Sequence, residues 1–493
     1  MINGLRESDS PVLPAKFSNK TMKVVAEKME GRGLTKGNLP EQNICRTQSR
    51  VSMQSALKRI REAAKRDKEL KFTSLYHHIY NVDVLREAYY GIKRNACAGV
   101  DGETWREYGK NLEENLQELS NRLKSGAYRA NIVLRVYIPK VDGNQRPIGV
   151  LVLEDKVVQR AAVIVLNMVY ETDFLGFSYG FRPGKNPHRA LDSLSVGIKR
   201  KKINWIVDAD IRNYFSSINH EWLIKFVEHR ISDRRVVRLI KKWLKAEVLE
   251  ENRITQNEAG TQQGGSISPL LANMYLHYVY DLWAQKWREK KSQGDVIVVR
   301  FADDIIMGFE NKSDADLFLE HLKLRFQKFN LALHPDKTRL IEFGRYAEER
   351  RGRRGQGRPE SFNFLGFTHI CGKNREGKFK IIRKTMKKKL RVKLKEIKLE
   401  LRRRLHSSVK DVGEWLRTVV QGHMNYFAVP GNSSDIGRFR YSISGLWFRT
   451  LKRRSDRHRM NWERMGKIRD RWLPSVRIIH PYPEERFERQ HPR

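Results

Sequence analysis

The amino-acid sequence predicts an α+β protein, with a mixed helix-and-strand body followed by an all-helical, strongly basic C-terminal region. Three observations support this prediction. Segments with strand-like alternation and segments with helical spacing interleave up to about residue 375. Residues 380–404 then hold thirteen Lys and Arg against two Glu, at helical spacing. The chain of 493 residues, 40% of them apolar, is long enough for two to four domains with a sizeable core.

The first half of the chain contains both kinds of pattern. Residues 1–50 mix Pro, Gly, Ser and charge without periodicity, which predicts a mobile leader. Helical spacing predicts helices over 52–66, 112–123 (with Leu112, Leu116, Leu119 and Leu123 on one face) and 154–170, the last one buried. Alternation predicts a strand over 133–139, with a hairpin turn over 141–146.

The second half continues the alternation of strands and helices. Strands are expected over 204–211, 338–343 and 361–368, and a helix from Pro269 to about Lys290. Ser313, Asp314, Ala315 and Asp316 resemble a capping box that opens a helix carrying Leu317, Leu324 and Phe329. Residues 345–359 are expected to be a flexible basic loop, 380–404 a helix, and helices continue to about Leu473.

The charge of the chain points to a polyanionic partner. Lys and Arg exceed Asp and Glu by 40, and nucleic acid is the simplest partner for such an excess; a basic protein of membrane surfaces is the alternative. No apolar run approaches the roughly 20 residues that span a bilayer, and residues 1–9 lack a secretory signal pattern. Cys45, Cys97 and Cys371 lie far apart without a CxxC pair, which favours a reducing compartment over disulfides or structural zinc.

Two adjacent carboxylates are the most informative local feature. Asp303 and Asp304 follow Phe301 and Ala302 between two apolar runs, 296–299 and 305–309. Two neighbouring Asp residues beside buried strands are costly to ionise unless a cation compensates them. Paired Mg²⁺ ions would compensate them, and phosphoryl transfer is a chemistry that such ions serve. A solvated Asp-Asp pair in a hairpin loop is the alternative.

A two-metal site needs a further carboxylate from another strand. Asp208 and Asp210 lie two residues apart in the strand expected over 204–211, so both face the same side of it. The residues alone leave open which of the two would serve.

Three motifs in order resemble the reverse transcriptase family. They are Asp210-Ile211-Arg212-Asn213-Tyr214-Phe215, Gln263-Gly264-Gly265-Ser266-Ile267-Ser268-Pro269-Leu270-Leu271-Ala272-Asn273 and Phe301-Ala302-Asp303-Asp304. The form QGGSISPLLAN is similar to that of bacterial group II intron enzymes, and the resemblance covers roughly residues 80–485. It implies a right-hand polymerase with fingers and palm, joined to a helical thumb or maturase (X) domain.

The resemblance implies the metal site and the sugar gate. Asp210, Asp303 and Asp304 would be catalytic and would hold two Mg²⁺ ions, with Mn²⁺ as a possible substitute and the backbone of Ile211 as a further ligand. Asp210 is selected over Asp208 because an aromatic residue, Phe215, follows it five positions later. The Phe215 ring would exclude a ribose 2′-OH, although burial in the core is the commoner fate of Phe.

The same resemblance implies the contacts to the incoming nucleotide. Lys140 and Arg146, on opposite arms of the expected hairpin turn, would close over the triphosphate; a generic exposed hairpin is the alternative. Gln263 and Gly264 would cradle the nucleotide and the template base, and Lys337 would protonate pyrophosphate. Residues 362–367, with Gly366, resemble the strand pair that grips the primer end.

Basic residues interleaved with aromatic ones predict nucleic-acid contacts. Arg182 lies in residues 170–189, which resemble a segment of group II intron enzymes suited to single-stranded template; packing against the fingers is the alternative. In the basic C-terminal region, which is similar to the family's maturase domain, the expected RNA-binding residues are Lys387, Lys388, Arg391, Arg403 and Arg453.

The resulting domain prediction is a leader over 1–50, an N-terminal extension and fingers over 51–200, a palm over 201–375, a thumb over 376–480 and a short tail over 481–493. The expected function is copying of intron RNA into DNA and promotion of splicing and mobility in the bacterial cytoplasm, associated with the nucleoid during mobility. The expected partners are group II intron RNA, a DNA target or primer and dNTPs, with no membrane. The alternatives are a splicing chaperone with little polymerase role and a retron-like or defence reverse transcriptase. The chain ends about twenty residues after the last expected helix without a paired Cys motif, so no C-terminal nuclease domain is expected.

Overall fold

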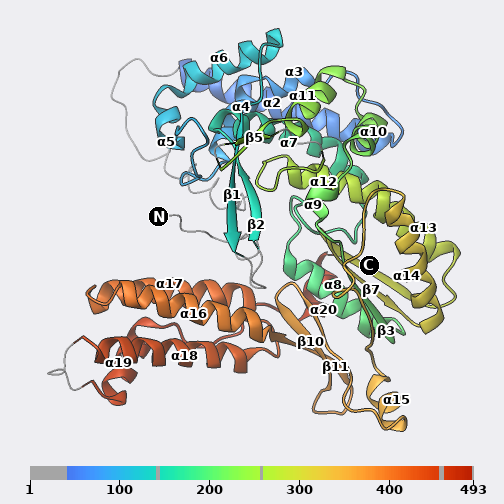
Figure 1. Ribbon diagram of the computed structural model, residues 1–493, viewed down its shortest axis with the longest axis vertical. Helices are drawn as coiled ribbons and strands as arrows, with labels where there is room; N and C mark the ends of the chain where they lie inside the picture. Colours follow the sequence, from blue (N-terminus) through green and yellow to red (C-terminus); the bar gives the residue numbers. More distant parts are fainter. Residues whose placement is uncertain (1–40, 140–144, 252, 256–258, 455–459, 491–493) are drawn as a thin grey trace.

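The computed structural model describes residues 41–139, 145–251, 253–255, 259–454 and 460–490. Helices and strands interleave up to Thr385, and helices follow (Figure 1). The α+β prediction is therefore confirmed. The leader expected over 1–50 lies outside the described residues up to residue 40, and α2 already begins at Glu41. Within the described residues, no helix has both the length and the apolar character needed to cross a membrane.

A layer of helices forms the upper part of the molecule in Figure 1. Its centre is α7, which buries Val157, Ala161, Val165 and Val169 completely, as the predicted buried helix requires. The predicted helix at 112–123 is also confirmed, with Leu116, Leu119 and Leu123 fully buried. The helices of this layer are α2 (Glu41–Arg66), α3 (Tyr76–Ile79), α4 (Val82–Tyr90), α5 (Trp105–Tyr108), a 3₁₀ turn (Gly109–Asn111), α6 (Leu112–Ser125), α7 (Leu153–Asp173), α10 (His220–Arg230) and α11 (Arg234–Leu244).

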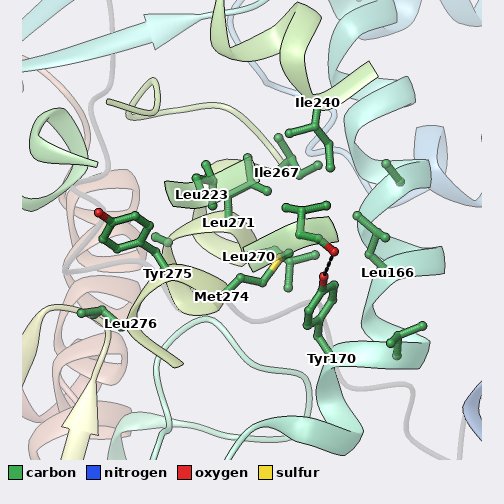
Figure 2. Packing of buried hydrophobic residues seen from close by; sticks show 14 of the residues in the cluster. Leu166, Tyr170, Leu223, Ile240, Ile267, Leu270, Leu271, Met274, Tyr275 and Leu276 are labelled. Atoms are coloured by element: carbon green, nitrogen blue, oxygen red, sulfur yellow. Dashed lines mark hydrogen bonds between the residues drawn. The ribbon is translucent and has the colours of Figure 1, made fainter. Parts of the chain in front are cut away.

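One core joins this layer to the helix that follows the Gln263-Gly264-Gly265 loop. Figure 2 shows Leu166 and Tyr170 of α7 beside Leu270 and Met274 of α12 (Ser268–Leu276). The Tyr170 hydroxyl donates a 3.3 Å hydrogen bond to a backbone carbonyl of α10. The predicted helix from Pro269 to Lys290 is confirmed as α12, a π-helical turn (His277–Asp281) and α13 (Leu282–Lys290) in succession.

A four-stranded sheet lies below the helical layer in Figure 1. Its strand order is β2-β1-β4-β5, formed by β1 (Val133–Pro139), β2 (Gln145–Val150), β4 (Val248–Glu250) and β5 (Arg253–Thr255). The strand predicted at 133–139 has the same bounds as β1. The turn predicted at 141–146 lies outside the described residues up to residue 144, and β2 already begins at Gln145.

The central sheet has four antiparallel strands in the order β6-β7-β3-β8. They are β3 (Trp205–Asp210), β6 (Val296–Phe301), β7 (Asp304–Phe309) and β8 (Arg339–Glu342), so the strands predicted near 204–211 and 338–343 are confirmed. The short helix α9 (Tyr214–Ser217) follows β3, and the other flanking helices are α8 (Pro187–Arg200) and α14 (Lys312–Gln327).

Two predictions about α14 are wrong. The helix begins at Lys312, and no side chain caps it. The Asp314 carboxylate instead accepts hydrogen bonds from the backbone amides of Gln293 and Gly294, in the loop before β6. The buried face carries Phe318, Leu322 and Phe326, whereas Leu317 and Leu324 are exposed and Phe329 lies beyond the end of the helix. Tertiary partners therefore override the local pattern.

A three-stranded sheet leads into the C-terminal helices. It consists of β9 (Phe362–Phe364), β10 (Phe367–Lys373) and β11 (Phe379–Thr385), so the single strand predicted at 361–368 is two strands joined by a turn at Leu365 and Gly366. The loop predicted at 345–359 contains a helix, α15 (Ala347–Arg353). Residues 380–385 are strand rather than helix, and a division between 375 and 376 would separate the paired strands β10 and β11.

The last helices form a bundle with its own core around Leu416, Phe439 and Trp447. The bundle consists of α16 (Lys387–Arg403), α17 (Val409–Phe427), α18 (Ser433–Lys452) and α19 (Trp462–Trp472), drawn in orange and red at the lower left of Figure 1. The expectation of a helix-free tail after Leu473 is wrong, because α20 (Pro483–Gln490) packs against α8.

Candidate active site

The turn between β6 and β7 presents the acidic pair. Phe301 pairs with Asp304 across the hairpin, so Ala302 and Asp303 form a two-residue turn. Ala302 has φ of 55°, in the left-handed region that costs a non-glycine residue free energy. The residues that follow the turn, Ile305, Ile306 and Met307, are buried, so the turn is held at one end of the sheet.

The third acid lies directly opposite this turn. Asp210, the last residue of β3, pairs with Asp304, the first residue of β7. Residues paired directly across antiparallel strands have Cβ atoms about 5 Å apart. Asp303 precedes Asp304 in the turn, so acids that are about ninety residues apart in the sequence come together at one end of the central sheet.

The electrostatics of Asp304 reflect this crowding. The residue is exposed to solvent, yet the protein that surrounds the carboxylate limits its hydration. This loss of hydration, with the negative charges of Asp303, Asp210 and Asp208, raises the pKa of Asp304 to about 8. At Asp304, the burial and the negative charges of the neighbouring acids therefore outweigh the opposing effect of Lys389.

These residues fit a hard divalent cation by the chemistry of their donors. Carboxylate and carbonyl oxygens are the ligands that Mg²⁺ prefers, and excess negative charge is what a cation relieves. Within the described ranges, no three acidic, imidazole or thiol groups are close enough as they stand to form a closed metal centre. The Ile211 backbone lies beside the acids, and its bridge to Leu333 uses the Asp210 carbonyl and the Arg212 amide.

Lys337 and Asp208 lie on the flank of this site. The Lys337 Nζ donates to Asp210 Oδ2 at 3.0 Å, and its half-exposed side chain makes this a weak, releasable ion pair. The Asp208 carboxylate is 3.6 Å from the Arg339 guanidinium. Burial, opposed by Arg339 and reinforced by Asp210, raises the pKa of Asp208 to about 6.

Phe215 lies on α9, five residues after Asp210. Its side chain is half-buried and packs against Tyr214 and the main core. Its carbonyl accepts a 2.7 Å hydrogen bond from the Thr261 amide. The ring is therefore held rigidly, which both a core role and a gate role require.

The Gln263-Gly264 segment lies against β2. Gly264 has φ of 112°, and a Cβ there would come within 2.4 Å of the Gly149 carbonyl oxygen. Glycine is therefore required for close approach of this loop to β2, which carries Arg146 in register with Ile138. Lys140 lies outside the described residues.

The structure reveals a buried arginine that the sequence analysis missed. Arg300 is completely buried, and its guanidinium bonds both carboxylate oxygens of Asp281, at 2.7 and 2.6 Å. It also donates to Asn273 Oδ1 and the Ala302 carbonyl, both at 3.0 Å, and to Ser178 Oγ at 2.7 Å. A lone arginine within the apolar run of β6 was the available signal, because a buried charge requires a partner.

Arg182 is buried and makes its contacts within the protein. Only 5% of its side chain is exposed. Its guanidinium pairs with Glu171 and donates to the carbonyls of Leu175 and Ser178, both at 2.7 Å. Packing, the alternative left open for this segment, describes Arg182 better than contact with nucleic acid. The segment does reach the β6–β7 turn, because a Cβ on Gly180 would lie 2.2 Å from the Ala302 amide nitrogen.

The basic residues chosen in the C-terminal bundle are all exposed: Lys387, Lys388, Arg391, Arg403 and Arg453. Lys389, which is not among the expected RNA-binding residues, is half-buried. Its positive charge acts to lower the pKa of Asp304, against the larger effects that raise it, and its Nζ would lie 3.6 Å from a Cβ on Gly366. Lys387 and Lys388 precede it directly in α16, but they lie at other angles around the helix and are exposed.

Comparison with known proteins finds a family match and several relatives. Residues 138–369 match the family model described as reverse transcriptase (RNA-dependent DNA polymerase). The chain is 29% identical to Protein YkfC of Escherichia coli over 317 residues, which cover 58% of this chain and 78% of YkfC. It is 31% identical to the group II intron-encoded protein LtrA of Lactococcus lactis over 306 residues, which cover 59% of this chain and half of LtrA.

A plant relative extends the comparison to maturases. The chain is 26% identical over 221 residues to nuclear intron maturase 3, mitochondrial, of Arabidopsis thaliana, covering 39% of this chain and 30% of that protein. The reverse transcriptase match includes Asp210, Asp303 and Asp304 within its bounds. Residues 138–369 therefore resemble reverse transcriptases, and the chain is similar to a group II intron-encoded protein and to an intron maturase.

Proposed function

We propose that this protein is an RNA-directed DNA polymerase that copies intron RNA, and that it also binds the intron RNA as a maturase to promote splicing and mobility. The observation that carries the proposal is the pairing of Asp210 with Asp304 across β3 and β7, next to Asp303 in the β6–β7 turn. Its partners would be group II intron RNA, a DNA primer or target, and dNTPs. We place it in the bacterial cytoplasm, with the nucleoid during mobility.

The proposed layout is a right hand. Fingers would comprise the helical layer and the β1–β2 hairpin, palm the central sheet, and thumb the bundle α16–α19. The hairpin descends toward the side of the bundle in Figure 1. The thumb boundary is better drawn at Lys387, where α16 begins, than at residue 376, because β10 and β11 form one hairpin. Lys387, Lys388, Arg391, Arg403 and Arg453 would contact the RNA backbone.

In the proposed reaction, the protein mainly positions charge. Asp210, Asp303, Asp304 and the Ile211 carbonyl would hold two Mg²⁺ ions, which when bound supply Lewis acidity toward the primer hydroxyl and the phosphates. Lys337 would leave Asp210 and donate a proton to departing pyrophosphate. Lys140, Arg146, Gln263 and Gly264 would hold the nucleotide, and the Phe215 ring would exclude a ribose 2′-OH.

The test is primer extension on an RNA template with Mg²⁺. Asp303→Ala should abolish DNA synthesis while binding of intron RNA and splicing assistance stay near the wild-type level, because the bundle is not altered. Asp336→Ala is a matched control, since Asp336 is an exposed acid outside the acidic cluster. Polymerisation retained in Asp303→Ala would refute the metal assignment. Splicing assistance by a wild-type protein that makes no DNA would favour the chaperone alternative.

A further inference from the structure

The outer face of α11 is entirely cationic. Each α11 residue that is exposed is Arg or Lys, and Lys245, which caps the helix, is exposed as well. Arg234, Arg238, Lys241 and Lys245 recur at intervals of three or four residues, so they lie within roughly 60° of the helix circumference and extend over about 16 Å. We call these four residues the α11 stripe.

The stripe is rigidly mounted. The opposite face of α11 buries Val236, Ile240 and Trp243 in the main core. At its start, the Asp233 carboxylate caps the helix and also accepts the backbone amides of Leu75 and Tyr76, both at 2.9 Å. The cations are therefore presented from a fixed element rather than from a mobile loop.

A cavity of about 220 Å³ extends this positive surface. Arg129, Lys242 and Lys245 line it, with Glu247 as its acidic member. Burial, together with the positive charges of Arg238 and Arg129, lowers the pKa of Lys242. Mutual repulsion of this kind is relieved by an anion. Asp233 is engaged by Arg235 at 3.2 Å, so it does not neutralise the stripe.

The α11 stripe is separate from the site of the acids. In Figure 1, α11 lies in the upper layer, at the end of the molecule away from β3 and β7 and from the C-terminal bundle. A nucleic acid bound to the stripe would therefore make a contact additional to those of the proposed polymerase groove and thumb.

The chemistry of the surface selects its partner. An amphipathic helix that binds lipid exposes apolar residues to insert, whereas the apolar face of α11 is fully used in the core. Single-stranded nucleic acid is bound with exposed aromatic rings, whereas Tyr76, Tyr128 and Trp243, three aromatic residues on or near α11, are buried. Cations without stacking or insertion groups suit a regular phosphate backbone.

From these observations we infer that the α11 stripe and the adjoining cavity bind the phosphate backbone of double-helical RNA, without reading its sequence. A 16 Å stripe spans roughly ten phosphate charges of a duplex. The contact would anchor a structured part of the RNA at the outer face of the fingers.

The test is a salt titration of binding to an RNA duplex closed by a loop at each end. The variant Arg234→Gln, Arg238→Gln, Lys241→Gln, Lys245→Gln removes four exposed charges and no core contact. The matched control Lys286→Gln, Lys290→Gln, Lys291→Gln, Lys323→Gln removes four exposed charges from α13, α14 and the residue after α13. Melting curves of both variants check that the fold is retained.

The stripe variant should lower the slope of log K against log salt by about three to four and weaken binding at least about tenfold at 0.1 M salt. The control should change either quantity little. Equal losses in both variants, or no loss in the stripe variant, would overturn the inference. Stronger binding of wild-type protein to anionic vesicles than to the duplex, lost in the stripe variant, would also overturn it in favour of a lipid surface.

Primer extension on a short primer–template separates this inference from the proposed function. The stripe variant should extend it at the wild-type rate, because α11 lies away from the acids. A matching loss of short-template extension would place α11 on the template path and overturn a separate site. Absence of extension by the wild-type protein would contradict the proposed function but leave the duplex titration valid.

Discussion

Removal of the Arg300 side chain should disturb the β6–β7 turn, which carries two of the proposed catalytic acids. Arg300 and Asp281 are both completely inaccessible to solvent, and their two side chains share two short hydrogen bonds. Arg300→Met would leave the Asp281 carboxylate buried without its arginine, with only the His277 ring 4.0 Å away. Breaking a buried pair in this way costs about 3–5 kcal/mol of unfolding free energy, whereas replacing both partners with apolar residues is often close to neutral. Asp281→Leu combined with Arg300→Met should therefore recover most of the lost stability.

Activity should respond differently from stability. The double variant still lacks the hydrogen bonds from Arg300 to the Ala302 carbonyl and to Asn273. A hydrogen bond from a charged donor contributes about 1.5–3 kcal/mol, so a less well-held turn should lower kcat by roughly tenfold to a hundredfold. The KM for dNTP should change less, because the Arg300 side chain is completely buried and supports the β6–β7 turn from the interior.

Urea denaturation and steady-state primer extension measure the two effects on the same preparations. Arg288→Met is a matched control, because Arg288 is a partly exposed arginine of α13 that donates a hydrogen bond to Gln285 within its own helix. The reasoning is refuted if Arg300→Met and the double variant are equally destabilised. It is also refuted if the double variant extends primers at the wild-type rate.

Three further predictions concern residues at or near the proposed active site. Phe215→Ala should let the enzyme incorporate ribonucleotides, measured as the ratio of kcat/KM for dNTP and rNTP; unchanged selectivity would remove the gate assignment. In metal-free protein, Asp304→Asn should raise the melting temperature, and the gain should grow from pH 4 to pH 8. The reason is that a folded-state pKa of about 8, above that of the unfolded chain, makes ionisation of Asp304 cost stability as pH rises; a gain independent of pH would contradict it. Lys389→Gln should raise the pKa of Asp304 further and reduce primer extension more than Lys388→Gln does; equal losses would show that the Lys389 charge acts only on the RNA backbone.

Several features could be predicted from local sequence. The strand at 133–139, the helices at 112–123 and 154–170, and the two apolar runs around Asp303 and Asp304 follow from periodicity, because their burial is set by their own spacing. The ordered motifs were sufficient to indicate the similarity to reverse transcriptases that the family match also finds. The basic composition was sufficient to indicate a polyanionic partner.

The sequence misled where a distant partner decides the role of a residue. Asp314 has the spacing of a helix cap, but it binds amides about twenty residues earlier in the chain. Arg182 lies in a segment whose composition suggested contact with nucleic acid, but its guanidinium is bound by Glu171 and by backbone carbonyls. The tail after Leu473 contains α20, whose Glu484 and Glu488 pair with Lys199 and Arg200 of α8.

By itself, then, the sequence determined the identity of the acids, the strands that carry them and the chemistry they suggest. Only the tertiary structure placed Asp210 opposite Asp304, put Arg300 beneath their turn and aligned the cations of α11 on an outer face. The physical reason is that spacing along one helix or strand records which side is buried, but not what it is buried against. Strand register and the pairing of buried charges depend on segments that are far apart in the chain.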